Sequence, residues 1–135
     1  MDCFTRHFSS LIFFLLLVTW CDSTFGQRTT HVQISNDIGK GSDLTIHCKS
    51  KDDDLGNHII PYQNTWEFHF RPNVWGTTQF YYSMAWKGVF HWFDIFVASR
   101  DSPYCHVCQW SIKPDGPCRF HYDTKKFDCF KWNSN

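Results

Sequence analysis

The stretch TWEFHFR, residues 65–71, alternates strictly between apolar and polar side chains. Its aromatic residues fall on one side of an extended chain, and Glu67, His69 and Arg71 fall on the other. Successive side chains of a β-strand point to opposite faces of the sheet. This two-residue period therefore predicts a half-buried strand rather than a helix.

The same alternation recurs on both sides of this stretch. It predicts further strands over His31–Ser35, Leu44–Lys49, Thr77–Trp86, Val89–Ala98 and Val107–Lys113. Val89–Ala98 is apolar on both faces, which is typical of a strand covered on both sides. Turn-forming residues separate these runs, most clearly at Lys87-Gly88 and Pro114–Pro117. Roughly seven to eight short strands at this spacing predict an all-β, antiparallel β-sandwich or barrel.

The remaining segments carry weaker patterns. The acidic run that begins at Lys51 and ends at Asn57 is interpreted as a solvated loop, because it lacks the spacing of a calcium-binding loop. The tail Lys125–Asn135 has no clear period, but its Phe130 and Trp132 predict that it docks on the body.

The N-terminal segment has the features of a signal peptide. Arg6 and His7 precede the apolar run Leu11–Val18, which is too short to span a bilayer, and small and polar residues follow it. We expect a cleaved signal peptide over residues 1–26, with a cut after Ser23 as the alternative. A single domain over 27–135 would then be secreted, extracellular and not membrane-embedded.

Composition excludes several classes of protein. Hydrophobic residues make up 42% and charged residues 19% of the chain, which is too apolar for a disordered protein. Lysine plus arginine and aspartate plus glutamate both number 13, so the formal net charge is zero. A nucleic-acid partner is therefore not predicted, since such proteins carry a basic surface.

The cysteines predict disulfides. The five that follow the signal peptide are Cys48, Cys105, Cys108, Cys118 and Cys129, so at least one of them stays unpaired within the chain. Two bridges among five cysteines allow about fifteen pairings. The Cys105–Cys108 spacing also occurs in zinc and redox sites, but secretion favours structural disulfides. We predict no metal site and no cofactor.

Catalysis is not predicted either. His47, His69 and Glu67 are placed on outward faces of strands, where nothing gathers them into a pocket. The sequence contains no nucleophile elbow, no metalloprotease motif and no phosphate-binding loop. Trp75 and Trp92 are interpreted either as contacts for a sugar or protein partner, or as residues that pack under a loop or the tail.

Four stretches together resemble the plant self-incompatibility protein family, the S-protein homologues. They are VQISNDIGKGSDLTIHCKSKDDDLG (32–56), WEFHFRPNVWGTTQF (66–80), WFDIFVASRD (92–101) and CQWSIKPDGPC (108–118). The resemblance implies a small secreted plant protein with a disulfide-braced β-sandwich and a role in signalling. The founding members are stylar proteins that inhibit incompatible pollen through a receptor on the pollen surface. The resemblance brings no catalytic residues.

One position departs from the family pattern. Members usually carry a cysteine near position 82, where this chain has Tyr82, and that loss from a set of roughly six cysteines would explain the odd number. Cys48 is a reasonable candidate for the orphaned partner, because it stands alone in the N-terminal half. We expect a less stable fold than that of a relative with the full set.

These observations give two expectations of function. The first is a secreted, non-enzymatic signalling ligand, recognised through its loops by a plant cell-surface receptor or membrane protein. The alternative is a glycan-binding or antimicrobial cell-wall protein that uses Trp75 or Trp92. The candidate partner-binding residues are Lys87, Gly88, Arg100, Asp101, Ser102 and Trp75.

Overall fold

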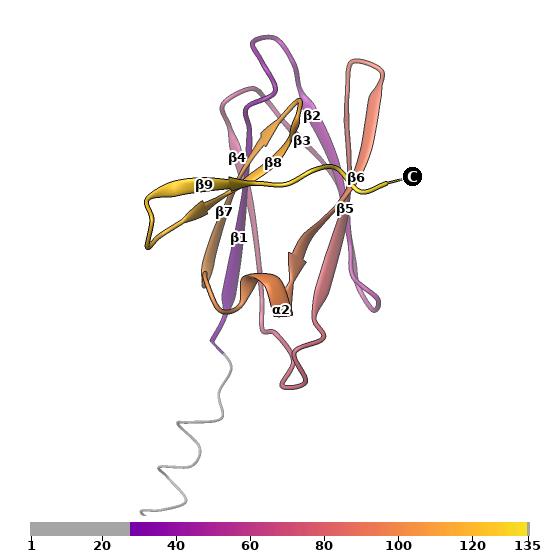
Figure 1. The fold of residues 1–135 in the computed structure, drawn as a ribbon. Coiled ribbons are helices and arrows are strands. Elements are labelled where there is room, and N and C mark those ends of the chain that lie inside the picture. Colours follow the sequence, from indigo (N-terminus) through magenta and orange to yellow (C-terminus); the bar gives the residue numbers. More distant parts are fainter. Residues whose placement is uncertain (1–27, 135) are drawn as a thin grey trace, which may run out of the picture.

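Nine strands and one short helix form the regular structure of residues 28–134, the part of the chain that the computed structural model describes (Figure 1). The strands are β1 (Thr30–Asn36), β2 (Leu44–Lys49), β3 (Asp54–Ile60), β4 (Thr65–Phe70), β5 (Gln79–Trp86), β6 (Val89–Val97), β7 (Val107–Lys113), β8 (Gly116–His121) and β9 (Lys126–Cys129). The helix, α2, spans Ala98–Asp101. The predicted all-β class is confirmed.

The strands form two sheets that face each other. One sheet has the order β4-β1-β7-β8-β9, and the other has the order β3-β2-β5-β6. All pairs are antiparallel except β1 with β7, which run parallel. The predicted disulfide-braced sandwich is confirmed, with nine strands where roughly seven to eight were expected.

The core lies between the inward faces of the two sheets. Val32 and Ile34 of β1, Ile46 of β2, Met84 of β5 and Ile112 of β7 are all fully buried. The two-residue period placed these side chains inward correctly, because one face of each strand must leave water while the other stays solvated.

The prediction that β6 is covered on both sides is only half right. A register shift next to Phe80 turns both Ile95 and Phe96 inward at the C-terminal half of β6. In the N-terminal half, Phe90 is 53% exposed and Trp92 is 38% exposed. The outer face of this sheet is therefore open where the sequence indicated a cover.

The acidic segment does not end as a loop. Asp54–Ile60 forms the edge strand β3, which pairs with β2. Its mixed burial and the shift in register between Cys48 and Lys49 hide the strand period. Gly56 has a φ of +76°, a backbone conformation that residues with a side chain rarely adopt.

The C-terminal segment docks, as predicted. It leaves β9 and crosses from the five-stranded sheet toward β6 (Figure 1). Phe130 and Trp132 pack against the core, and the Trp132 indole donates a hydrogen bond to the Pro114 carbonyl at 3.1 Å. The Asn133 amide donates to the Trp92 carbonyl at 3.0 Å, which ties the tail to the free edge of β6.

Two disulfides brace the five-stranded sheet and its flanking loop. Cys105 bonds to Cys108, and Cys118 bonds to Cys129. Cys48 is a buried free thiol, as the sequence suggested. Its cross-strand partner is Tyr82, which is also fully buried. Burial raises the pKa of the Cys48 thiol to about 12, so it stays protonated and unreactive.

The predicted signal peptide, residues 1–26, lies outside the described residues. Within residues 28–134, no helix is long and apolar enough to cross a membrane.

Candidate functional site

One end of the sandwich gathers three connections. The β2–β3 loop (Ser50–Asp53), the β4–β5 loop (Arg71–Thr78) and the segment from α2 to Tyr104 meet there. The strand register requires this, because Lys49 pairs with Tyr81 and Gln79 pairs with Val97. We call residues 50–53, 71–78 and 98–104 the loop end.

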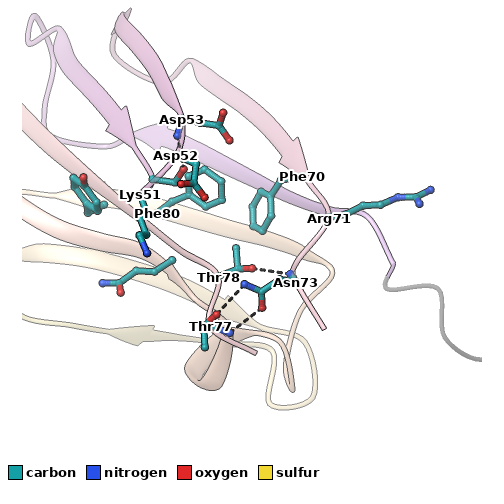
Figure 2. Close-up of a pocket in the computed structure, with 12 residues that line it drawn as sticks. Lys51, Asp52, Asp53, Phe70, Arg71, Asn73, Thr77, Thr78 and Phe80 are labelled. Carbon is teal, nitrogen blue, oxygen red and sulfur yellow. Dashed lines mark hydrogen bonds between the residues drawn. The ribbon is translucent and has the colours of Figure 1, made fainter. Parts of the chain in front are cut away.

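A pocket of about 590 Å³ opens between the first two loops (Figure 2). Phe70 and Phe80 form its apolar floor, with ring centroids 4.5 Å apart. Polar and charged side chains form most of the rest. The full lining is Ser50, Lys51, Asp52, Asp53, Phe70, Arg71, Asn73, Thr77, Thr78, Gln79, Phe80 and Tyr81.

The β4–β5 loop is held by its own hydrogen bonds. The Asn73 amide nitrogen of the main chain donates to the Thr78 hydroxyl at 2.7 Å. The Asn73 side chain donates to the Thr77 hydroxyl at 2.8 Å and accepts from the Thr77 main-chain N–H at 3.0 Å (Figure 2). This arrangement leaves Trp75 81% exposed at the tip of an ordered loop.

The β2–β3 loop is fixed in the same way. The Asp53 N–H donates to the Ser50 hydroxyl at 3.0 Å, and the Ser50 N–H donates to the Asp53 carbonyl at 2.8 Å. Hydrogen bonds from the Gly56 N–H and then from His47 lower the pKa of Asp54, which follows the loop.

The pocket rim carries both signs of charge. Lys51 and Arg71 supply cations, and Asp52 and Asp53 supply carboxylates. The lining, all of it within the described residues, contains no cysteine and no histidine. This set of hydroxyl, amide and charged groups over an apolar floor suits the binding of a polar ligand or a protein loop better than group transfer.

Of the predicted partner-binding residues, Asp101 is interior and Arg100 is half-buried. Asp101 has no exposed surface, and its carboxylate accepts hydrogen bonds from Arg100, from Arg119 and from the Val97 N–H. Burial removes this carboxylate from any surface that a partner touches, so its assignment to the recognition loop is corrected to a structural role.

Arg100 belongs to the same cluster. Its guanidinium carbon lies 5.2 Å from the Phe93 and Trp110 ring centroids and 5.0 Å from that of Phe130. Three rings and the Asp101 carboxylate occupy most of the cation, which stabilises the fold and leaves little of it for a partner. A charged pair after a strand resembles an exposed loop in sequence, and only the tertiary contacts reveal its burial.

The other predicted residues divide between two places. Trp75 and exposed Ser102 lie at the loop end. Lys87 and Gly88 form the exposed two-residue turn between β5 and β6, at the opposite end. Both have positive φ, 40° and 78°, which is the backbone of a type I′ hairpin turn. The six residues therefore do not form one site.

The histidine and carboxylate candidates are also separated. His47 lies on the outer face of the four-stranded sheet, 2.8 Å from Asp54. Glu67 and His69 lie on the other sheet, where Glu67 contacts the His31 ring at 2.6 Å. Hydrogen bonds from Gln33 and then His31 lower the pKa of Glu67. The structure does not bring His47 and Glu67 together.

Sequence reasoning identified Trp75 but missed the pocket beside it. Phe70 and Phe80 were expected to face the core, and Lys51–Asn57 was interpreted as a solvated loop. The pocket forms because the β2–β3 hairpin ends beside the β4–β5 loop, which crosses from one sheet to the other, and no local pattern encodes that arrangement.

Comparison with known proteins gives consistent matches. Residues 31–132 match the family described as plant self-incompatibility protein S1. S-protein homolog 5 of Arabidopsis thaliana is 51% identical over 105 residues, covering 78% of this chain and 79% of that protein. S-protein homolog 20 of the same plant is 42% identical over 132 residues, covering 93% and 96%.

A solved structure has the same fold. It is described as a self-incompatibility protein homologue from a widespread family of small, highly stable, secreted plant proteins. It superposes with a TM-score of 0.61 at 19% identity, covering 82% of this chain and 100% of that chain.

Proposed function

Because this chain belongs to the plant self-incompatibility protein S1 family, we propose that it is a secreted, non-enzymatic signalling ligand of plants. A protein on the cell surface recognises it through the loop end. The β-sandwich serves as a scaffold that positions the loops, in the way that many binding proteins carry recognition residues on connections between rigid strands.

The exposed Trp75 carries this proposal. Tryptophan is enriched among the residues that dominate binding energy at protein interfaces, above all where it is presented in a fixed position. Trp75 is 81% exposed and Val74 beside it is 66% exposed. The Asn73 hydrogen bonds order this loop before any partner arrives, which reduces the entropy lost on binding.

The pocket next to Trp75 supports the same conclusion. Its apolar floor and its mixed charges offer a partner a place for one inserted side chain and for several hydrogen bonds. The pocket is formed by two separate loops, β2–β3 and β4–β5, so substitutions in either loop can change the specificity of binding without disturbing the core.

A binding assay on living cells tests the proposal. Labelled protein spanning Gln27–Asn135, with its disulfides formed, is titrated onto plant protoplasts, whose wall polysaccharides have been removed, with and without an excess of unlabelled protein. We expect saturable, competed binding that mild surface proteolysis abolishes. No saturable binding to any cell type, or binding that survives proteolysis, would contradict a protein receptor.

Three variants locate the contact. Trp75→Ala is expected to weaken cell binding by about tenfold or more, as is common when a tryptophan that becomes buried in the complex is removed. Trp92→Ala is the matched control, since Trp92 is also exposed but lies on a sheet away from the loop end. Lys87→Asn retains a residue that tolerates positive φ and removes the charge, so it tests the opposite end separately.

A further inference from the structure

The outer face of the four-stranded sheet carries exposed aromatic residues. Register places Phe90 and Trp92 of β6 beside Ala85 and Ser83 of β5, with Tyr81 following on β5. Phe90 is 53% exposed and Trp92 is 38% exposed. The Trp92 ring centroid lies 5.5 Å from that of Phe90 and 6.5 Å from that of Tyr81. We call Phe90, Trp92 and Tyr81 the aromatic ridge.

The fold itself does not require this ridge. The inward-facing residues of β5 and β6, such as Met84 and Phe93, already fill the core. The tail bonds only to the Trp92 main-chain carbonyl, through Asn133, and leaves the ring exposed. Adjacent exposed aromatic residues on the solvent face of a sheet mark an interaction site.

Small side chains form a strip of the sheet face beside the ridge, which we call the groove. Thr45 of β2 lies opposite Ala85 of β5, and Ile59 of β3 lies on the far side of Thr45. At the β5–β6 turn the groove ends in a hollow of about 390 Å³ that Asp43, Thr45, Ala85 and Phe90 help to line. The strand that forms its centre, from Gln79 to Ala85, is roughly 20 Å long.

Polar groups line the next part of the groove. His47, Asn57 and Ser83 occupy one cross-strand row that ends at Trp92. The charges beside this row are internally balanced, because Asp54 contacts the His47 ring at 2.8 Å and the Lys49 ammonium at 3.9 Å. Asp94 follows on the same face, opposite Tyr81, and Asp43 and Lys87 line the hollow. The groove therefore offers hydrogen bonds without an excess of cations.

This combination selects one chemistry. The C–H faces of sugar rings stack on aromatic side chains, and sugar hydroxyls need fixed hydrogen-bond partners around them. An extended, flat groove suits a linear chain of sugars, and its carboxylates, which no excess of cations offsets, disfavour anionic ligands. A surface that binds a protein usually carries aromatic and arginine residues at its centre. The centre of this face has Thr45, Ser83 and Ala85 instead.

We propose that the outer face of the four-stranded sheet, along the aromatic ridge, is a binding site for a neutral, linear oligosaccharide. The site lies on the face of the sheet, adjoins the loop-end pocket at Tyr81, and does not depend on the proposed receptor. Of the two exposed tryptophans, Trp92 is the one that belongs to it, because Trp75 stands at a loop tip at the other end of the sheet.

A titration of the mature chain tests the proposal. Cellohexaose and xylohexaose are the neutral probes, and hexagalacturonate is the anionic comparison of equal length. Backbone and indole NMR shifts report where binding occurs. We expect saturable shifts at residues 83, 85, 90 and 92 with at least one neutral probe, and binding at least about tenfold weaker to hexagalacturonate.

Three variants provide the controls. Trp92→Ala is expected to lower the affinity for the neutral probe by about tenfold or more, and Trp75→Ala is expected to leave that affinity unchanged. Ala85→Lys fills the groove without removing a ring, so it is expected to block binding even if Trp92→Ala perturbs the fold. The proposal is overturned by absence of saturable shifts with both neutral probes, by full binding in Ala85→Lys, or by a dimer that Trp92→Ala abolishes.

Discussion

Replacing Tyr82 with cysteine is expected to form a third disulfide, to Cys48. The two residues are direct cross-strand partners on β2 and β5, and both side chains are fully buried on the inward face. The chain already forms a bridge in this geometry, because Cys118 and Cys129 are direct cross-strand partners on β8 and β9.

The size of the effect follows from the loop that the bridge closes. About 34 residues separate the two positions, and loss of loop entropy in the unfolded chain would stabilise the fold by about 4 kcal/mol. Removing the buried tyrosine ring costs about 3–5 kcal/mol. The net change from the wild type is therefore expected to be near zero, which makes the choice of reference decisive.

Tyr82→Ala is the appropriate reference, because it removes the same ring without supplying a thiol. In urea unfolding, oxidised Tyr82→Cys is expected to be about 4 kcal/mol more stable than Tyr82→Ala. Thiol titration of the denatured mature chain should find one thiol in the wild type and none in Tyr82→Cys. Two remaining thiols, or a bridge without added stability over Tyr82→Ala, would refute the reasoning.

Three further predictions concern stability. Asp101→Asn leaves Arg100 and Arg119 without their buried anion and should lower the free energy of unfolding in urea by about 3–5 kcal/mol. Asp128→Asn, at the exposed end of the same cluster, should lower it by only about 0–1 kcal/mol. Equal effects of the two variants would contradict this prediction. Gly116→Ala would place a Cβ in collision with the Phe130 carbonyl oxygen. It should cost about 1–3 kcal/mol more than Gly39→Ala, because Gly39 has nearly the same φ, +152° against +149°, and its Cβ would meet open space. A difference near zero would show that the tail moves freely. The pKa values of Glu67 and Asp54 are lowered in the folded state, so their contribution to the free energy of unfolding is present above about pH 4 and is lost as pH falls through the folded pKa values. Stability should therefore decrease in that acid range, and Glu67→Gln should make the decrease smaller. An unchanged dependence of stability on pH in Glu67→Gln would count against this assignment.

Much of the fold could be predicted from local pattern. Leu44–Lys49 and Val107–Lys113 were predicted with their observed bounds, because strict alternation follows directly from a strand with one buried face. Asp54–Ile60 was missed, since an edge strand with a register shift and a positive-φ glycine loses that alternation. The parallel pairing of β1 with β7 has no local signal at all.

The candidate sites were less predictable for the same physical reason. Trp75 was identified because an aromatic residue in a turn-rich segment has no obvious core role. Asp101 was misplaced, because its burial depends on Arg119 of β8. Arg100 is half-buried, because its guanidinium packs against Trp110 of β7 and Phe130 of the tail. The exposure of Phe90 on the outer face of β6 was not predicted, because the whole strand is apolar in sequence.

Competition on plant protoplasts, which lack wall polysaccharides, tests the central claim most directly. Unlabelled wild type, Trp75→Ala and Trp92→Ala are each used to displace labelled wild-type protein. The account predicts that Trp92→Ala displaces the label as well as the wild type, while about tenfold more Trp75→Ala is needed. Equal displacement by Trp75→Ala and the wild type would contradict recognition through the loop end.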